Sequence, residues 1–193
     1  MITLPNRIFF TGVPGSRWSG IAQILEQLPG FNITDRTPDR TYDHHTFTGH
    51  LGAYFGKGME FHPILSAEYI DQAHGNTKGT RLIKSHDWAY QLDDIKQEFP
   101  DDWTMLVYRP DMTSFAWWHE AGGFKIKYPC YNAYVDSINM MAEIASQNKA
   151  ILDYACKKNA KWEYFTEEWM QQTFGHSIVL DKVWPDILVT MIK

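Results

Sequence analysis

The sequence has few cysteines and no long apolar run. Its two cysteines, Cys130 and Cys156, lie far apart and form no CxxC pair, which gives no zinc-site pattern and favours a reducing compartment. No segment approaches the roughly 18 to 20 apolar residues that a membrane span needs, and no long apolar stretch marks a secretion signal at the N-terminus. These absences predict a soluble, cytoplasmic protein with no membrane partner.

The sequence also lacks an excess of positive charge. Lysine and arginine number 18 against 23 aspartates and glutamates, so the formal net charge is -5. Binding of nucleic acid depends on many Lys and Arg contacts to phosphates. The charge therefore argues against a nucleic-acid partner and favours a small or neutral one.

No repeat, linker or low-complexity stretch divides the chain. With 193 residues, of which 44% are hydrophobic and 15% aromatic, it is long enough to bury one substantial core. We therefore expect a single domain over residues 1–193.

Apolar patterns alternate between strands and helices along most of the chain. Residues 7–12 (RIFFTG), 80–86 (TRLIKSH) and 103–109 (WTMLVYR) are short apolar runs that predict buried strands. The first two runs are followed by segments whose apolar residues have helical spacing, as Ile21 and Leu25 do. After the third run, Pro110 suits the first position of a helix that ends near Gly122 and Gly123. This repetition of strand, loop and helix is typical of an α/β fold.

The C-terminal half continues the alternation. Apolar spacing predicts one long helix from about 131 to 158, and residues 161–165 (KWEYF) predict a fourth strand. Thr166 can cap the next helix, and Gly175 can end it. We therefore expect an α/β fold with a mostly parallel sheet that is flanked by helices on both faces.

Residues 11–20 (TGVPGSRWSG) resemble a phosphate-binding loop that has lost its lysine. When the pattern GxxxxGK[ST] is started at Gly12, its second glycine falls on Arg17, its lysine falls on Trp18, and only Ser19 matches. Nucleotide kinases use that lysine on the β and γ phosphates. What remains is a strand, a Gly/Pro turn and a helix N-terminus, whose N–H groups and dipole favour a bound anion.

The next two strands end in further candidate ligands. The second strand ends in KSH, with Lys84 and His86, and the third ends in Arg109 before a helix that carries Thr113 and Ser114. Doubly wound sheets bind their ligands beyond the carboxyl ends of the strands. We therefore expect these residues to lie near the loop after the first strand.

Together these motifs resemble the sulfotransferases that use 3'-phosphoadenosine 5'-phosphosulfate. TGVPGSRWSGIAQIL is similar to their 5'-phosphosulfate loop, RLIKSH to their strand ending in KTH, and LVYRPDMTSFAWWHE to their 3'-phosphate segment. WEYFTEEWMQQTFG is similar to their YEDL strand and the helix before an FLG turn. The motifs span residues 7–175 in the family's order and imply a P-loop-like fold of sulfotransferase type. The family's C-terminal RKG segment has no counterpart here.

The resemblance implies an in-line transfer of a sulfuryl group to a hydroxyl or amine of an acceptor, leaving adenosine 3',5'-bisphosphate and requiring no metal. His86 would act as the general base, and Lys84 and Arg17 would neutralise the developing charge. The lysine of the family's loop falls on Gly15, and its glycine falls on Arg17. Arg17 would therefore supply the missing cation.

The resemblance also implies the donor contacts. Arg109 would bind the 3'-phosphate with bidentate geometry, together with the hydroxyl of Ser114 or of its alternative, Thr113. The 5'-phosphosulfate would be held by the loop residues Pro14, Gly15, Ser16, Arg17, Trp18 and Ser19.

Two irregular, aromatic-rich segments, 31–79 and 117–131, are expected to lie on the acceptor side. The histidines within residues 42–62 match no standard metal motif. Aromatic side chains in an acidic chain favour a small-molecule or sugar-like acceptor.

Two other functions fit the same loop. One is an atypical P-loop phosphotransferase, which would turn over a nucleotide with magnesium. The other is a nucleotide-binding module without catalytic activity, which would bind the donor and transfer nothing.

Overall fold

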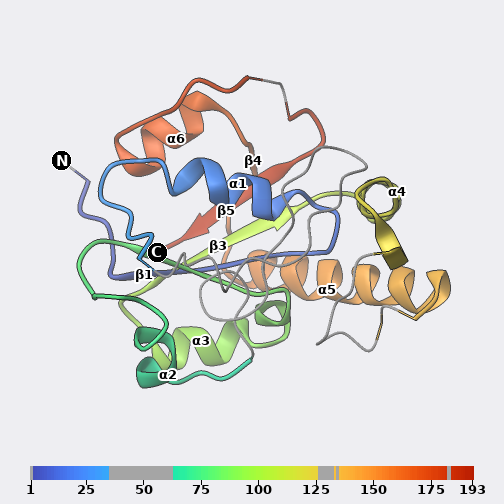
Figure 1. Ribbon diagram of the computed structural model, residues 1–193, viewed down its shortest axis with the longest axis horizontal. Coiled ribbons are helices and arrows are strands. Elements are labelled where there is room, and N and C mark those ends of the chain that lie inside the picture. The colour runs from blue at the N-terminus through green and yellow to red at the C-terminus, as the bar shows by residue number, and fades with distance from the viewer. Residues whose placement is uncertain (1, 35–62, 126–132, 134, 182–183) are drawn as a thin grey trace.

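A five-stranded sheet lies at the centre of the molecule (Figure 1). The computed structural model describes residues 2–34, 63–125, 133, 135–181 and 184–193. The strands are β1 (Arg7–Gly12), β2 (Arg81–Lys84), β3 (Trp103–Tyr108), β4 (Glu163–Tyr164) and β5 (Leu188–Ile192). The helices are α1 (Trp18–Leu25), α2 (Ala67–Asp71), α3 (Leu92–Glu98), α4 (Asp111–Glu120), α5 (Ser137–Lys157) and α6 (Glu167–Phe174), with the short 3-10 helices η2 (Asp87–Tyr90) and η3 (Gly123–Lys125).

The strands follow the order β2-β1-β3-β5-β4. Strand β1 pairs in parallel with both β2 and β3, whereas β5 is antiparallel to β3 and to β4. The α/β class is therefore confirmed, but a mostly parallel sheet is not, because the pairings made by β5 give a mixed sheet. Among the five strands, β5 is the one that the sequence pattern does not predict.

Helices cover both faces of the sheet, as predicted. Successive residues of a strand point to opposite faces. Ile8 and Phe10 accordingly join one buried cluster with residues of α1 and α6, whereas Phe9 joins another with residues of α3 and α5. Figure 1 shows α1 and α6 on one side of the sheet and α3 and α5 on the other.

Two helix ends follow the signals in the sequence. The hydroxyl of Thr166 accepts a hydrogen bond from the N–H of Trp169 at 3.1 Å, which caps α6. Gly175 ends the same helix with a φ of 77°. Helix α5 begins at Ser137 and not at about 131 as predicted, because the carboxylate of Asp136 accepts the N–H of Asn139 at 2.8 Å and caps the helix there.

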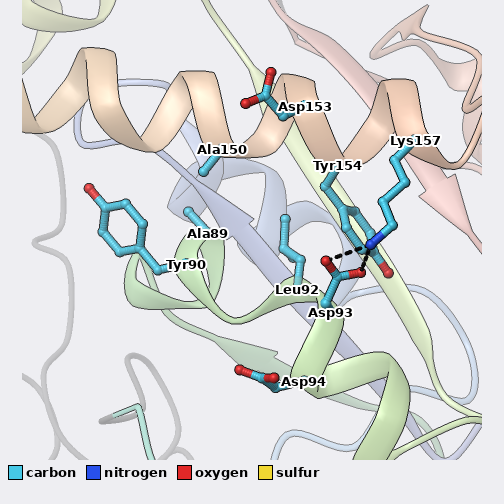
Figure 2. Close-up of a pocket in the computed structure, with 9 residues that line it drawn as sticks. All are labelled: Ala89, Tyr90, Leu92, Asp93, Asp94, Ala150, Asp153, Tyr154 and Lys157. Atoms are coloured by element: carbon cyan, nitrogen blue, oxygen red, sulfur yellow. Dashed lines mark hydrogen bonds and ion pairs between the residues drawn. The ribbon is translucent and has the colours of Figure 1, made fainter.

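An ion pair joins α5 to α3 at the surface. Lys157 Nζ donates to the two carboxylate oxygens of Asp93 at 2.7 and 2.8 Å (Figure 2). The pair borders a cavity of about 290 Å³, which Leu92 and Ala150 also line. Both charged side chains are more than half exposed, so the pair contributes at most about 1 kcal/mol. The residues predicted for the functional site do not line this cavity.

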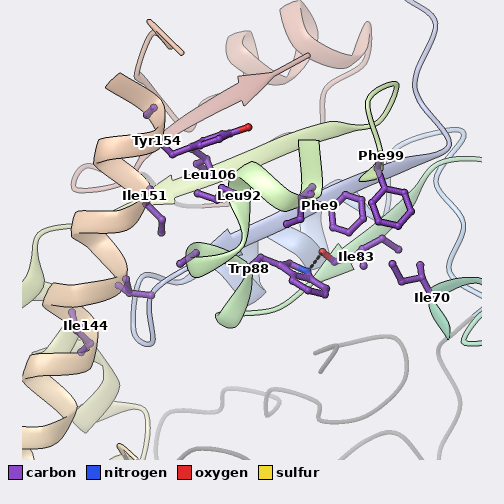
Figure 3. Packing of buried hydrophobic residues seen from close by; sticks show 14 of the residues in the cluster. Phe9, Ile70, Ile83, Trp88, Leu92, Phe99, Leu106, Ile144, Ile151 and Tyr154 are labelled. Atoms are coloured by element: carbon purple, nitrogen blue, oxygen red, sulfur yellow. Dashed lines mark hydrogen bonds between the residues drawn. The ribbon is translucent and has the colours of Figure 1, made fainter. Parts of the chain in front are cut away.

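Trp88 fixes the segment that follows β2. Its side chain is fully buried, its ring contacts Phe9 edge-on at 5.7 Å between centroids, and its Nε1 donates to the carbonyl of Ile83 at 3.0 Å (Figure 3). Removing such a side chain typically costs about 3 to 5 kcal/mol. The packing of Trp88 therefore holds His86, two residues earlier, at the end of β2.

Parts of the two predicted acceptor-side segments, 35–62 and 126–132, lie outside the described residues, as does Cys130. The single-domain prediction for residues 1–193 therefore stays a prediction. Within the described ranges, every helix is too short or too polar to cross a membrane, and His, Cys, Asp and Glu side chains form no group of three that could hold a metal ion.

Candidate functional site

Segments that follow three strands meet at one edge of the sheet. Because β1, β2 and β3 are parallel, the loop 13–17, His86 and Arg109 all lie beyond their carboxyl ends. Strand β5 runs the other way, so the chain just before Leu188 reaches the same edge. The chain leaves β1 toward α1 on one face and β3 toward α4 on the other. Open α/β sheets bind ligands between loops that diverge in this way.

The loop after β1 packs closely on helix α4. The N–H of Ser16 donates to the carbonyl of Val13 at 3.0 Å, and Gly15 has a φ of 77°. A Cβ on Gly15 would lie 1.9 Å from the backbone oxygen of Ser114. The position that the resemblance assigns to a lysine therefore has no room for a side chain.

Arg109 joins the end of β3 to this loop. Its Nη1 donates to the carbonyl of Gly15 at 3.0 Å, and its Nη2 lies 3.6 Å from a carboxylate oxygen of Asp186. The backbone carbonyl of Arg109 accepts from Ser114 Oγ at 3.2 Å and from Asn148 Nδ2 at 2.9 Å. Because Ser114 is fully buried, its hydroxyl holds the backbone of Arg109 in place. The alternative hydroxyl, that of Thr113, belongs to a half-buried side chain.

Two buried polar atoms beside the loop lack a partner. Ser16 Oγ and Arg109 Nε are shielded from solvent, and neither makes a hydrogen bond within the described residues. Leaving a buried polar atom unpaired costs about 1 to 3 kcal/mol. Helix α1 also begins here without a side-chain cap, between the buried Pro14 and the half-buried Ser19. These unpaired donors fit a site that a bound anion completes.

Arg17 lies between two tryptophans. Its Cζ is 3.9 Å from the ring centroid of Trp117 and 4.8 Å from that of Trp184. Burial, followed by the charge of Arg109, lowers the pKa of Arg17, while the carboxylate of Asp186 raises it. The guanidinium is therefore stacked against aromatic rings beside a second arginine, with Asp186 as their nearby counter-charge.

His86 is a neutral histidine whose two ring nitrogens are both engaged. Its Nδ1 bonds to the carbonyl of Gly12, and its Nε2 accepts from Trp18 Nε1 at 3.2 Å. Since a carbonyl only accepts and an indole only donates, the proton lies on Nδ1. Burial lowers the pKa of His86 to about 3. Nε2 can accept a proton from a substrate only after the indole of Trp18 has moved away.

Lys84 is fully buried and forms an ion pair with Glu26, the residue that ends α1. Its ammonium therefore neutralises a carboxylate beneath α1. Breaking such a buried pair by removing one partner typically costs about 3 to 5 kcal/mol. Lys84 therefore has a structural role, which the sequence analysis does not predict.

An aromatic cavity adjoins the arginines. It has a volume of about 630 Å³, and its lining combines aromatic and apolar side chains with three acidic residues: Tyr164, Phe165, Trp184, Leu180 and Pro185 with Glu167, Glu168 and Asp181. The indole of Trp184 contacts Arg17, and a Cβ on Gly20 would lie 3.1 Å from that indole. Trp184 therefore lines the cavity and also contacts Arg17.

Several residues that shape the site carry no motif in the sequence. Glu26 has one usable signal, since it lies four residues after the buried Ala22 on the inner face of α1. Asn148 is buried in the middle of α5, where a polar side chain needs a partner. Trp184 and Asp186 belong to a segment whose position depends on β5.

Comparisons of the chain with models of protein families, with curated proteins and with solved structures find no match.

Gly15→Ala is expected to destabilise the protein by about 3 kcal/mol, because the new Cβ meets the α4 backbone and the residue has a positive φ. Gly30→Ala is the matched control, since Gly30 has a φ of 92° and open space around it, and it should cost about 1 kcal/mol. Urea unfolding measures both changes. Equal losses in the two variants would contradict the close packing of the loop on α4.

His86 should also make stability depend on pH. The folded state keeps it neutral down to a pH of about 3, whereas the unfolded chain protonates it near pH 6.5. Because only the unfolded chain binds this proton between pH 6.5 and pH 3, the free energy of unfolding is highest above pH 6.5. Below pH 6.5 it falls by about 1.4 kcal/mol for each pH unit of acidification. In urea titrations between pH 7 and pH 5, His86→Asn should show a smaller loss than the unmodified protein. The same slope in both proteins would contradict the low pKa.

Proposed function

We propose that this chain is a sulfotransferase that uses 3'-phosphoadenosine 5'-phosphosulfate and that has a P-loop-like anion site. The observation that carries the proposal is the convergence of Arg17 and Arg109 on the loop before α1, where Ser16 Oγ and Arg109 Nε have no hydrogen-bond partner among the described residues. Unpaired buried donors at a helix N-terminus favour an anion with several oxygens.

Three groups of described residues would each hold a different part of the donor. Backbone N–H groups at the start of α1 and the hydroxyl of Ser16 would hold the phosphosulfate, beside Arg17. Arg109 would hold the 3'-phosphate, with Ser114 positioning its backbone. The cavity beside Trp184, with a volume of about 630 Å³, would have room for a purine ring against its aromatic side chains, and Glu167, Glu168 and Asp181 also line it.

When bound, the donor would supply a sulfuryl group to an acceptor hydroxyl or amine. His86 Nε2 would take the acceptor's proton, which requires its release from Trp18. Arg17 would offset the developing negative charge without a metal ion. Lys84 would contribute to this charge only after separating from Glu26, so Arg17 is the stronger candidate of the two.

A nucleotide-binding module without transferase activity is the second candidate. The pairing of Lys84 with Glu26 and the pKa of about 3 at His86 favour it, because both groups are engaged in structural contacts. The phosphotransferase is the least favoured function, since Trp18 occupies the position of the phosphate-binding lysine and donates to His86.

Ligand-dependent stability separates these functions. Adenosine 3',5'-bisphosphate at roughly 100 times its dissociation constant should stabilise the protein by about 2.7 kcal/mol. ATP with magnesium should have a smaller effect at the same concentration. Stabilisation by ATP and magnesium alone, in a thermal melt, would overturn the proposal in favour of a phosphotransferase.

Arg109→Lys should weaken binding of adenosine 3',5'-bisphosphate by roughly tenfold, because lysine keeps the charge but loses the forked donor geometry. Arg81→Lys is the matched control: Arg81 is also buried, but it pairs with Asp71 at the opposite edge of the sheet. Titration calorimetry should show unchanged affinity in the control. Equal weakening in both variants would exclude Arg109 as a ligand.

His86→Asn separates an enzyme from a binding module. The variant should bind adenosine 3',5'-bisphosphate normally but lose transfer of a radiolabelled sulfuryl group to phenols or sugars. Transfer that persists in the variant would exclude His86 as the base. If the unmodified protein binds the bisphosphate and transfers nothing to any acceptor, the module is the correct function.

A further inference from the structure

We infer that Asp186 is a built-in counter-anion that a ligand must displace, and that it restricts this edge of the sheet to multiply charged anions. The inference rests on the proposed function, because it assumes that the arginines bind an anionic ligand.

The geometry gives Asp186 this position. Its carboxylate lies 3.6 Å from Arg109 Nη2, and its side chain is half exposed, whereas that of Arg109 is 10% exposed. The guanidinium cannot follow the carboxylate outward, because its Nη1 is fixed on the carbonyl of Gly15. Asp186 is therefore the movable member of the pair, on the side from which a ligand must approach.

The free protein needs a negative charge at this point. Arg17 and Arg109 share the ring of Trp117, with Cζ to centroid distances of 3.9 and 5.9 Å, so two positive charges lie close together. Burial lowers the pKa of both arginines; Asp186 opposes this shift, and Glu120 opposes it more weakly. Without Asp186, the repulsion between the two guanidinium groups would lose its largest compensation.

Displacement of this carboxylate discriminates between ligands by charge. A monoanion that replaces Asp186 exchanges one unit of negative charge for another, so it gains little. A dianion supplies the lost charge and one more, which both arginines can use. Asp186 also lies two residues after Trp184, a wall of the aromatic cavity.

Asp186→Asn tests this role, with Asp153→Asn as the control. Asp153 is an exposed residue of α5 that pairs with Lys149, so its replacement makes the same change in net charge far from the arginines. Titration calorimetry in low-chloride buffer would use pyrophosphate, methanesulfonate and adenosine 3',5'-bisphosphate as probes. Asp186→Asn should bind pyrophosphate about tenfold more tightly than the unmodified protein. It should also gain measurable affinity for the monoanion methanesulfonate, while Asp153→Asn changes neither.

A thermal melt provides a second readout. Without added anions, Asp186→Asn should melt at a lower temperature than the unmodified protein, and pyrophosphate should restore its midpoint.

Equal or weaker binding of pyrophosphate by Asp186→Asn would overturn the inference. If adenosine 3',5'-bisphosphate still bound in that case, the result would support the proposed donor site and contradict the role of Asp186. Tighter pyrophosphate binding without any binding of the bisphosphate would support Asp186 and contradict the donor. An absence of binding to all three probes would contradict both.

Discussion

The parallel pairing of β1 with both of its neighbours is the constraint on which the rest of the structure depends. It brings the carboxyl ends of three strands to one edge, so residues nearly 100 positions apart become neighbours there. The hydrogen bond from Arg109 to the Gly15 carbonyl is possible only in this register. That bond in turn fixes the loop against α4, whose backbone leaves no space beside Gly15. Direct contacts therefore join the loop, Arg109 and helix α4.

Charge at this edge is distributed between buried pairs and groups open to ligands. Lys84 and Glu26 neutralise each other beneath α1. Lys84, which the sequence predicts as a cation of the site, therefore has its charge balanced within the protein. Arg17 and Arg109 remain next to tryptophans and to a half-exposed carboxylate. Burial keeps His86 uncharged, although its hydrogen bond to the Gly12 carbonyl acts in the opposite direction. The proposed anion binding can therefore use the arginines in their present positions, whereas the proposed proton transfer requires a local change around Trp18.

Local patterns in the sequence predict the α/β class, the first three strands, the strand at residues 161–165 and the caps at Thr166 and Gly175, because each depends on near neighbours in the chain. They also predict that the loop, His86 and Arg109 meet, since parallel strands end at a common edge. The antiparallel β5 is not predictable in the same way, because a short apolar run does not specify its direction or its partner. For the same reason the sequence does not reveal Glu26 as the partner of Lys84, or Asp186 and Trp184 as neighbours of the arginines. Those contacts depend on tertiary packing.

The left-handed backbone of Arg17 has a consequence for how this loop can vary. Its φ of 64° is a conformation that suits glycine and costs other residues about 1 to 2 kcal/mol. In the sulfotransferase family that we propose for this chain, the loop position that corresponds to Arg17 is a glycine. Codons for glycine and arginine are interconverted by a single-nucleotide change, so this position can gain or lose a guanidinium while the path of the chain stays the same. A loop of fixed shape can in this way acquire a cation at its rim when the site inside has no space for a lysine.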